Sequence, residues 1–136
     1  MKALWLKLIN VLVLIICFPT TSPLAYALAE VTPIEFKVVY GDRTTLFVLR
    51  PNKLGATVDY SNDRGRISSK QVTAKEFQFL KTKVSELGGP TNLRSDCHRS
   101  YVELKTNRRT LLGCIGSRNK LTEDLQKLTN LLSIIF

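Results

Sequence analysis

The segment SDCHRSYVELKTNRRTLLGCIG (95–116) constrains the fold of this chain most strongly, because it holds two of the three cysteines and the only histidine. If Cys97 and Cys114 form a disulfide, the segment is a covalently closed hairpin. If both thiols are free beside His98, it is a metal or catalytic site. The choice depends on the compartment, since stable disulfides need an oxidising environment.

The first residues have the order of a secretory signal peptide. Lys2 and Lys7 supply positive charge, an apolar run follows over 8–18, and small residues surround Tyr26. This order is typical of a cleaved leader. A helix over that run is about 16 Å long, roughly half the hydrocarbon thickness of a bilayer, which disfavours a membrane anchor. We expect cleavage after Ala27, or alternatively after Ala29, and an exported chain, periplasmic or secreted, in which residues 28–136 form one small domain.

Cleavage would remove Cys17 and leave Cys97 and Cys114, and an even cysteine count in an exported small domain predicts a disulfide. A turn centred on residues 107–108 places Tyr101 opposite Cys114. Cys97 then lies four residues earlier, about 13 Å along an extended strand. We therefore expect the loop over 89–100 to bend back, so that the disulfide clamps it onto the hairpin.

A metal or thiol site is the alternative for the same segment. Asp96, Cys97, His98 and Cys114 are residue types that bind zinc or copper, but the short paired ligand motifs of four-coordinate sites are missing. We also expect Cys97 and His98 to project from opposite faces, as neighbours on a strand do. An envelope enzyme or metal-handling protein that uses His98 with Asp96 or a cysteine remains the second hypothesis for function.

Alternating apolar and polar residues predict the strands. Ile34, Phe36, Val38 and Tyr40 recur at period two, which is the pattern of a half-buried strand. Further strands are predicted over 45–50, 55–60 and 67–72, with Pro51-Asn52 ending the second, and a last hairpin joins YVELKT to RTLLGCIG. Because the first four are close in sequence, we expect antiparallel pairing.

Two amphipathic helices complete the pattern. The first is predicted over 73–90, with a capping box at Thr73 and Glu76 and a stop at Gly88-Gly89-Pro90. Its apolar face consists of Phe77, Leu80, Val84 and Leu87, while Lys75, Lys81 and Lys83 are expected to face solvent. The second, over 119–136, is capped by Asn119 or Thr122 and repeats Leu121, Leu125, Leu128, Leu132 and Ile135.

These elements predict an α+β fold in ββββ-α-ββ-α order: about six short antiparallel strands, with both helices on one face of the sheet and one disulfide. We interpret the leucine face of the last helix as core, which favours a monomer.

The chain is basic, with a net charge of +9, and its cations concentrate around the last hairpin. The candidate contacts with an anion or partner are Arg99, Lys105, Arg108, Arg109 and Arg118. Nucleic acid is not expected as the partner, because no stripe of aromatic residues accompanies the arginines. The sequence has no G-x-S-x-G, H-E-x-x-H or glycine-rich phosphate loop. We therefore expect a binding module without a cofactor, not an enzyme, that contacts an acidic protein or an anionic envelope component.

Overall fold

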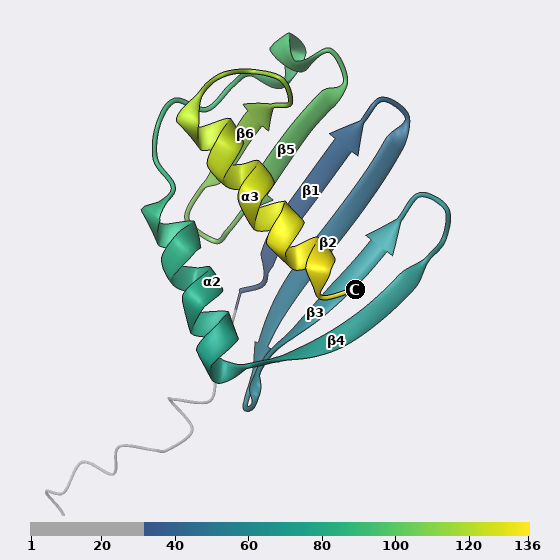
Figure 1. The fold of residues 1–136 in the computed structure, drawn as a ribbon, viewed down its shortest axis with the longest axis vertical. Coiled ribbons are helices and arrows are strands. Elements are labelled where there is room, and N and C mark those ends of the chain that lie inside the picture. The colour runs from purple at the N-terminus through teal and green to yellow at the C-terminus, as the bar shows by residue number, and fades with distance from the viewer. Residues whose placement is uncertain (1–31) are drawn as a thin grey trace, which may run out of the picture. The chain divides into compact units, whose positions relative to one another are not determined.

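The computed structural model describes residues 32–136, and the expected leader with its cleavage site lies outside this range. The elements are β1 (Ile34–Tyr40), β2 (Arg43–Asn52), β3 (Gly55–Asn62), β4 (Ile67–Thr73), α2 (Ala74–Glu86), the 3₁₀ turn η2 (Arg94–Cys97), β5 (Ser100–Lys105), β6 (Thr110–Cys114) and α3 (Lys120–Ile134). This order confirms the predicted ββββ-α-ββ-α arrangement (Figure 1).

The six strands form one antiparallel sheet in the order β4-β3-β2-β1-β5-β6. The first four strands are a meander, and β5 pairs with the free side of β1, with Phe36 opposite Leu104. The last hairpin therefore joins the sheet next to its first strand. The predicted α+β class is confirmed, and β1 is the strand at which the two parts of the sheet meet.

Strand β2 is longer than the sequence predicts, because it continues through Pro51 to Asn52. Pro51 pairs with Ala56 of β3, whereas β1 begins at Ile34, opposite Leu49. Beyond Leu49 the strand thus has a neighbour on one side only. Proline is tolerated at such an edge position, since its missing N–H need not leave a gap in a ladder.

Both helices lie across one face of the sheet (Figure 1). The residues that alternate toward this face are buried, including Phe36, Phe47, Leu49, Val58 and Leu104. The helices contribute Leu80, Val84, Leu121, Leu125 and Leu132 to the same core. Burial of these apolar side chains is the main term that stabilises the domain. Neither of the two helices within residues 32–136 has the length and apolar character that a membrane span requires.

Helix α2 begins as predicted and ends earlier. The Thr73 hydroxyl accepts a hydrogen bond from the Glu76 N–H, and the Glu76 carboxylate accepts one from the Thr73 N–H, which completes the capping box. The helix ends at Glu86, and Leu87 follows in an extended conformation. The expected glycine cap is therefore wrong, since the chain has already left the helix before Gly88.

Helix α3 packs closely on β6. Asn119 is its N-cap and accepts a hydrogen bond from the Thr122 N–H at 2.7 Å. Thr122 is buried against Gly113 of β6, where an added Cβ would lie 2.5 Å from the Thr122 Oγ1. Of the two predicted caps, Asn119 is the one used, and the glycine permits the close approach of helix and strand.

The disulfide between Cys97 and Cys114 is present, and Tyr101 lies opposite Cys114 as predicted. The loop before β5 bends back through η2, and the Asn92 N–H donates to the Leu112 carbonyl at 2.7 Å. Asn92 also accepts from the Cys114 N–H, so the loop lies along the outer edge of β6. The predicted clamp is confirmed, and the disulfide is consistent with an oxidising compartment.

Candidate anion-binding cleft

The five cations of the predicted contact surface occupy two ends of the β5–β6 hairpin. Arg99 directly precedes β5 and Arg118 follows β6, both at the disulfide end. Lys105, Arg108 and Arg109 lie at the turn between the strands. Because β5 separates the groups, they are about 17 Å apart along the strand. The structure therefore brings three of the five together and places the other two elsewhere.

Lys105 differs from its neighbours at the turn. It pairs in register with Glu35 of β1, so the two side chains lie side by side on the sheet face opposite the helices. Lys105 thus has an acid as its cross-strand neighbour, and it does not line the cleft described below.

The turn itself is organised by Thr106. Its Oγ1 accepts hydrogen bonds from the N–H groups of Arg108 and Arg109, and its N–H donates to the Arg109 carbonyl at 2.9 Å. These bonds fix the backbone of the turn, while the Arg108 side chain is exposed. The two adjacent arginines are therefore presented by a hydrogen-bonded turn.

Arg109 is directed at the end of α2. Its guanidinium donates to the Val84 carbonyl at 2.8 Å and to the Leu87 carbonyl at 3.0 Å. These are carbonyls at the helix C-terminus, where the helix dipole is negative and a cation is stabilising. Arg109 thus takes the capping role that the sequence assigned to the glycines, and it joins the hairpin to α2.

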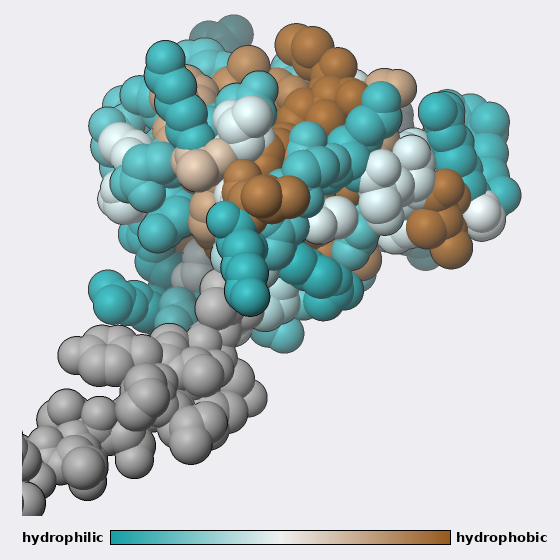
Figure 2. All heavy atoms as spheres, turned by 90° about the horizontal axis from the view of Figure 1, so that it is seen from below, coloured by the Kyte–Doolittle hydropathy of each residue, from teal (hydrophilic) through white to brown (hydrophobic). Residues whose placement is uncertain are grey.

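The contact between hairpin and helix encloses a cleft of about 560 Å³. Its apolar residues are Ile34, Pro51, Phe77 and Val84, and its polar residues are Thr32, Ser85, Thr106 and Asn107. Its charged residues are Lys81, Arg108 and Arg109, all of them cations. Figure 2 looks at the molecule from below the view of Figure 1 and shows apolar residues exposed among hydrophilic ones on that side. The lining of the cleft therefore combines apolar surface with polar and cationic groups.

None of these three cations has an acidic partner within residues 32–136. The Lys81 ammonium lies 5.7 Å from the centre of the Phe77 ring. Neither Lys81 nor Arg108 forms an ion pair with any carboxylate in residues 32–136. Arg109 is bound to helix carbonyls and not to an acid. The cleft therefore carries uncompensated positive charge next to apolar surface.

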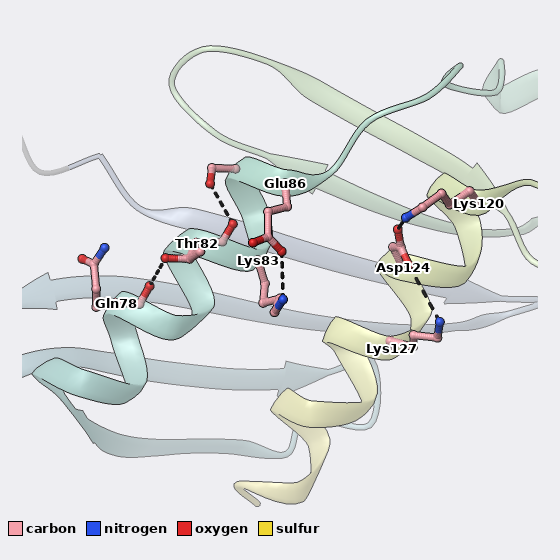
Figure 3. A network of polar contacts seen from close by, with 8 residues as sticks. Gln78, Thr82, Lys83, Glu86, Lys120, Asp124 and Lys127 are labelled. Carbon is pink, nitrogen blue, oxygen red and sulfur yellow. Dashed lines mark hydrogen bonds and ion pairs between the residues drawn. The ribbon is translucent and has the colours of Figure 1, made fainter.

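A second groove, between α2 and α3, provides a comparison. It has a volume of about 370 Å³ and includes Lys83, Lys120 and Lys127. Here the lysines face acids: Lys83 pairs with Glu86 at 2.8 Å, and Lys120 and Lys127 both pair with Asp124 (Figure 3). The hydrogen bond from Lys120 lowers the pKa of Asp124. This groove is close to neutral, which distinguishes it from the cleft at the hairpin turn.

The residues of the alternative metal or catalytic site line a cavity of about 520 Å³ at the disulfide end, which contains Asp96 and His98. Both cysteines are in the disulfide and are not free thiolates. Cys97 and His98 lie in η2 and its cap and not on a strand, so our argument from strand alternation was wrong. Within residues 32–136, no three metal-binding side chains lie close enough together to hold an ion.

Sequence reasoning did not identify Lys81, Phe77 or Ile34 as part of this site. Lys81 was expected on the solvent face of the helix, and it is indeed exposed. The spacing of four between Phe77 and Lys81 indicates that they are neighbours on one helix face. Which part of the chain packs beside that face depends on the hairpin, which is distant in sequence.

Comparisons of this chain with protein-family models, with curated proteins and with solved structures found no significant match in any of the three.

Proposed function

We propose that this protein is an exported, disulfide-stabilised binding module, not an enzyme, and that it contacts an anionic partner through the cleft between α2 and the β5–β6 turn. The observation that carries the proposal is the charge of this cleft: its three charged side chains are all cationic. Cations that lack acidic partners attract anions, and arginine suits carboxylates and phosphates because it offers paired donors.

Of the five cations proposed as contacts from the sequence, Arg108 and Arg109 line the cleft. Arg108 keeps its role as a contact, and Lys81 joins it because both line the cleft. Arg109 supports the site by holding α2 beside the turn. Arg99 and Arg118 lie at the other end of the hairpin and serve as controls in the experiment below.

The test is a binding titration of the purified full chain with a panel of anions, at about 0.15 M ionic strength. The panel contains an acidic peptide, anionic vesicles and short organic acids. We expect saturable binding of at least one member. The double variant Lys81→Gln with Arg108→Gln should weaken it by about tenfold or more.

The matched control is Arg99→Gln with Arg118→Gln, which removes the same charge from the disulfide end. This variant should bind like the wild type. Equal weakening by both double variants would show that only net charge matters. A panel in which no anion binds saturably would overturn the proposed function.

A further inference from the structure

The cleft combines positive charge with apolar lining residues, and a site for a simple inorganic anion needs only the charge. The apolar lining residues, here called the apolar wall, are Ile34 of β1, Pro51 of β2, and Phe77 and Val84 of α2. Ile34 and Phe77 are only partly buried, and both pack against the main core. An inorganic anion gains nothing from such a wall, whereas a hydrocarbon chain that covers it removes apolar surface from water.

The charged groups are positioned beside this wall. Lys81 lies over the Phe77 ring, so one side chain pair presents an ammonium and an aromatic surface together. Arg108 lines the same cleft from the β5–β6 turn, where Thr106 and Asn107 add polar groups. An anionic head group near Arg108 and Lys81 would leave its attached chain next to Phe77 and Ile34.

We propose that the ligand of this cleft is an amphiphilic organic anion: a single carboxylate or phosphate head attached to a short hydrocarbon tail. This inference rests on the proposed function and specifies its ligand class. The head group binds Arg108 and Lys81, and the tail packs on Ile34, Pro51 and Phe77. A cleft of about 560 Å³ lies within the usual range for small-molecule sites.

The source of such a group is a free short-chain acid or a lipid in a membrane, and two probes distinguish them. Octanoate represents the free acid, and vesicles containing an anionic phospholipid represent the membrane. Acetate and inorganic phosphate carry charge without a tail, and 1-octanol carries the tail without charge. Each is titrated into the purified full chain, and backbone and methyl resonances are followed by NMR.

We expect octanoate to bind saturably, with shifts at Ile34 and Phe77, and to bind about tenfold or more tightly than acetate, phosphate or 1-octanol. Lys81→Gln with Arg108→Gln should weaken octanoate by a similar factor, and Arg99→Gln with Arg118→Gln should not. Phe77→Ser should weaken octanoate while leaving acetate binding unchanged. Saturable binding to the vesicles in place of octanoate, with the same dependence on variants, would assign the head group to a lipid.

Four results would overturn the inference. If 1-octanol binds as tightly as octanoate, the cleft is apolar only. If acetate or phosphate binds as tightly, the tail contributes nothing, and the proposed anion-binding function stands while the ligand class is rejected. If the acidic peptide alone binds and both octanoate and the vesicles fail, the partner is a protein. If no anion binds saturably, the proposed function is rejected as well.

Discussion

At one end of the β5–β6 hairpin a covalent bond joins Cys97 to Cys114, whereas at the other end Arg109 holds α2 through two hydrogen bonds. The cavity at the disulfide end contains one acid, Asp96, and no lysine or arginine. The turn end gathers cations without an acid in its cleft. In the sequence the two ends form one basic segment, but in the structure they differ. The disulfide end holds the loop over 89–100 against β6, and the turn end carries the cations of the cleft.

Removing the disulfide should have the largest effect on stability. The bond links residues separated by 17 positions, and a loop of this length contributes about 3 kcal/mol through the entropy of the unfolded chain. We expect Cys97→Ala with Cys114→Ala to lower the free energy of unfolding by that amount in urea denaturation.

Anion binding at the turn end should survive this change wherever the variant is folded. Wild-type protein treated with a reductant is the control and should match the variant. An unchanged unfolding curve for the variant would show that the clamp is held by the hydrogen bonds of Asn92 and Thr91 instead.

The next largest effect is expected at Arg109. Replacement by Met removes both hydrogen bonds to the carbonyls of Val84 and Leu87 and keeps most of the apolar stem. Hydrogen bonds that involve a charged group contribute about 1.5–3 kcal/mol, so we expect a loss of about 2 kcal/mol in thermal or urea unfolding.

Arg108→Met is the matched control, because Arg108 is the neighbouring arginine and its side chain has no partner among residues 32–136. It should change stability by less than about 0.5 kcal/mol. If both variants lose the same free energy of unfolding, Arg109 does not stabilise the end of α2 more than Arg108 does.

A smaller effect is expected at Arg94, which pairs with Glu103 and lies 5.2 Å from the centre of the Tyr101 ring. The hydrogen bond that Arg94 donates to the Glu103 carboxylate raises the pKa of Arg94. The Arg94 side chain is 60% exposed, and ion pairs at exposed positions contribute little to stability. In urea denaturation, Arg94→Ala should therefore lower the free energy of unfolding by less than Arg109→Met does. An equal loss would show that this ion pair also stabilises the disulfide end.

The smallest effect is a pH dependence at the start of α2. The backbone N–H and hydroxyl of Thr73 donate to the Glu76 carboxylate and lower its pKa below the ordinary value of 4.5. Because the pKa is lower in the folded state, this stabilisation is complete above the ordinary value and is lost as the pH falls through the folded value.

Unfolding curves from about pH 7 to about pH 3 measure this effect. Glu76→Gln should be slightly less stable than the wild type at neutral pH, and its stability should decline less on acidification. Parallel pH profiles for the two proteins would show that the capping box does not contribute to the acid sensitivity of the domain.

Much of the fold could be predicted from local patterns. Period-two alternation in IEFKVVY, the capping box at Thr73 and the leucine repeat of the last helix each depend on residues close in sequence. The position of Tyr101 opposite Cys114 followed from one turn, since a register in a hairpin is fixed by its turn. The end of α2 was predicted wrongly, because its cap comes from Arg109, 22 residues after Leu87.

The candidate site could be predicted only in part. Arg108 and Arg109 stood out as adjacent cations, but nothing in the sequence shows that one binds helix carbonyls and the other faces a cleft. Arg99 and Arg118 lie far from the turn because β5 and β6 both run between the turn and the disulfide end. Charge that is clustered in sequence was therefore a poor guide to charge that is clustered in space.

By itself, the sequence determined the element order, the two helix faces and the pairing of Cys97 with Cys114, because periodicity, caps and a single hairpin act over short distances along the chain. Only the tertiary structure decided that Lys81, Phe77 and Ile34 meet Arg108 around one cleft. These residues come from three separate elements, and their contacts arise when α2 and the hairpin pack against the sheet to bury apolar surface.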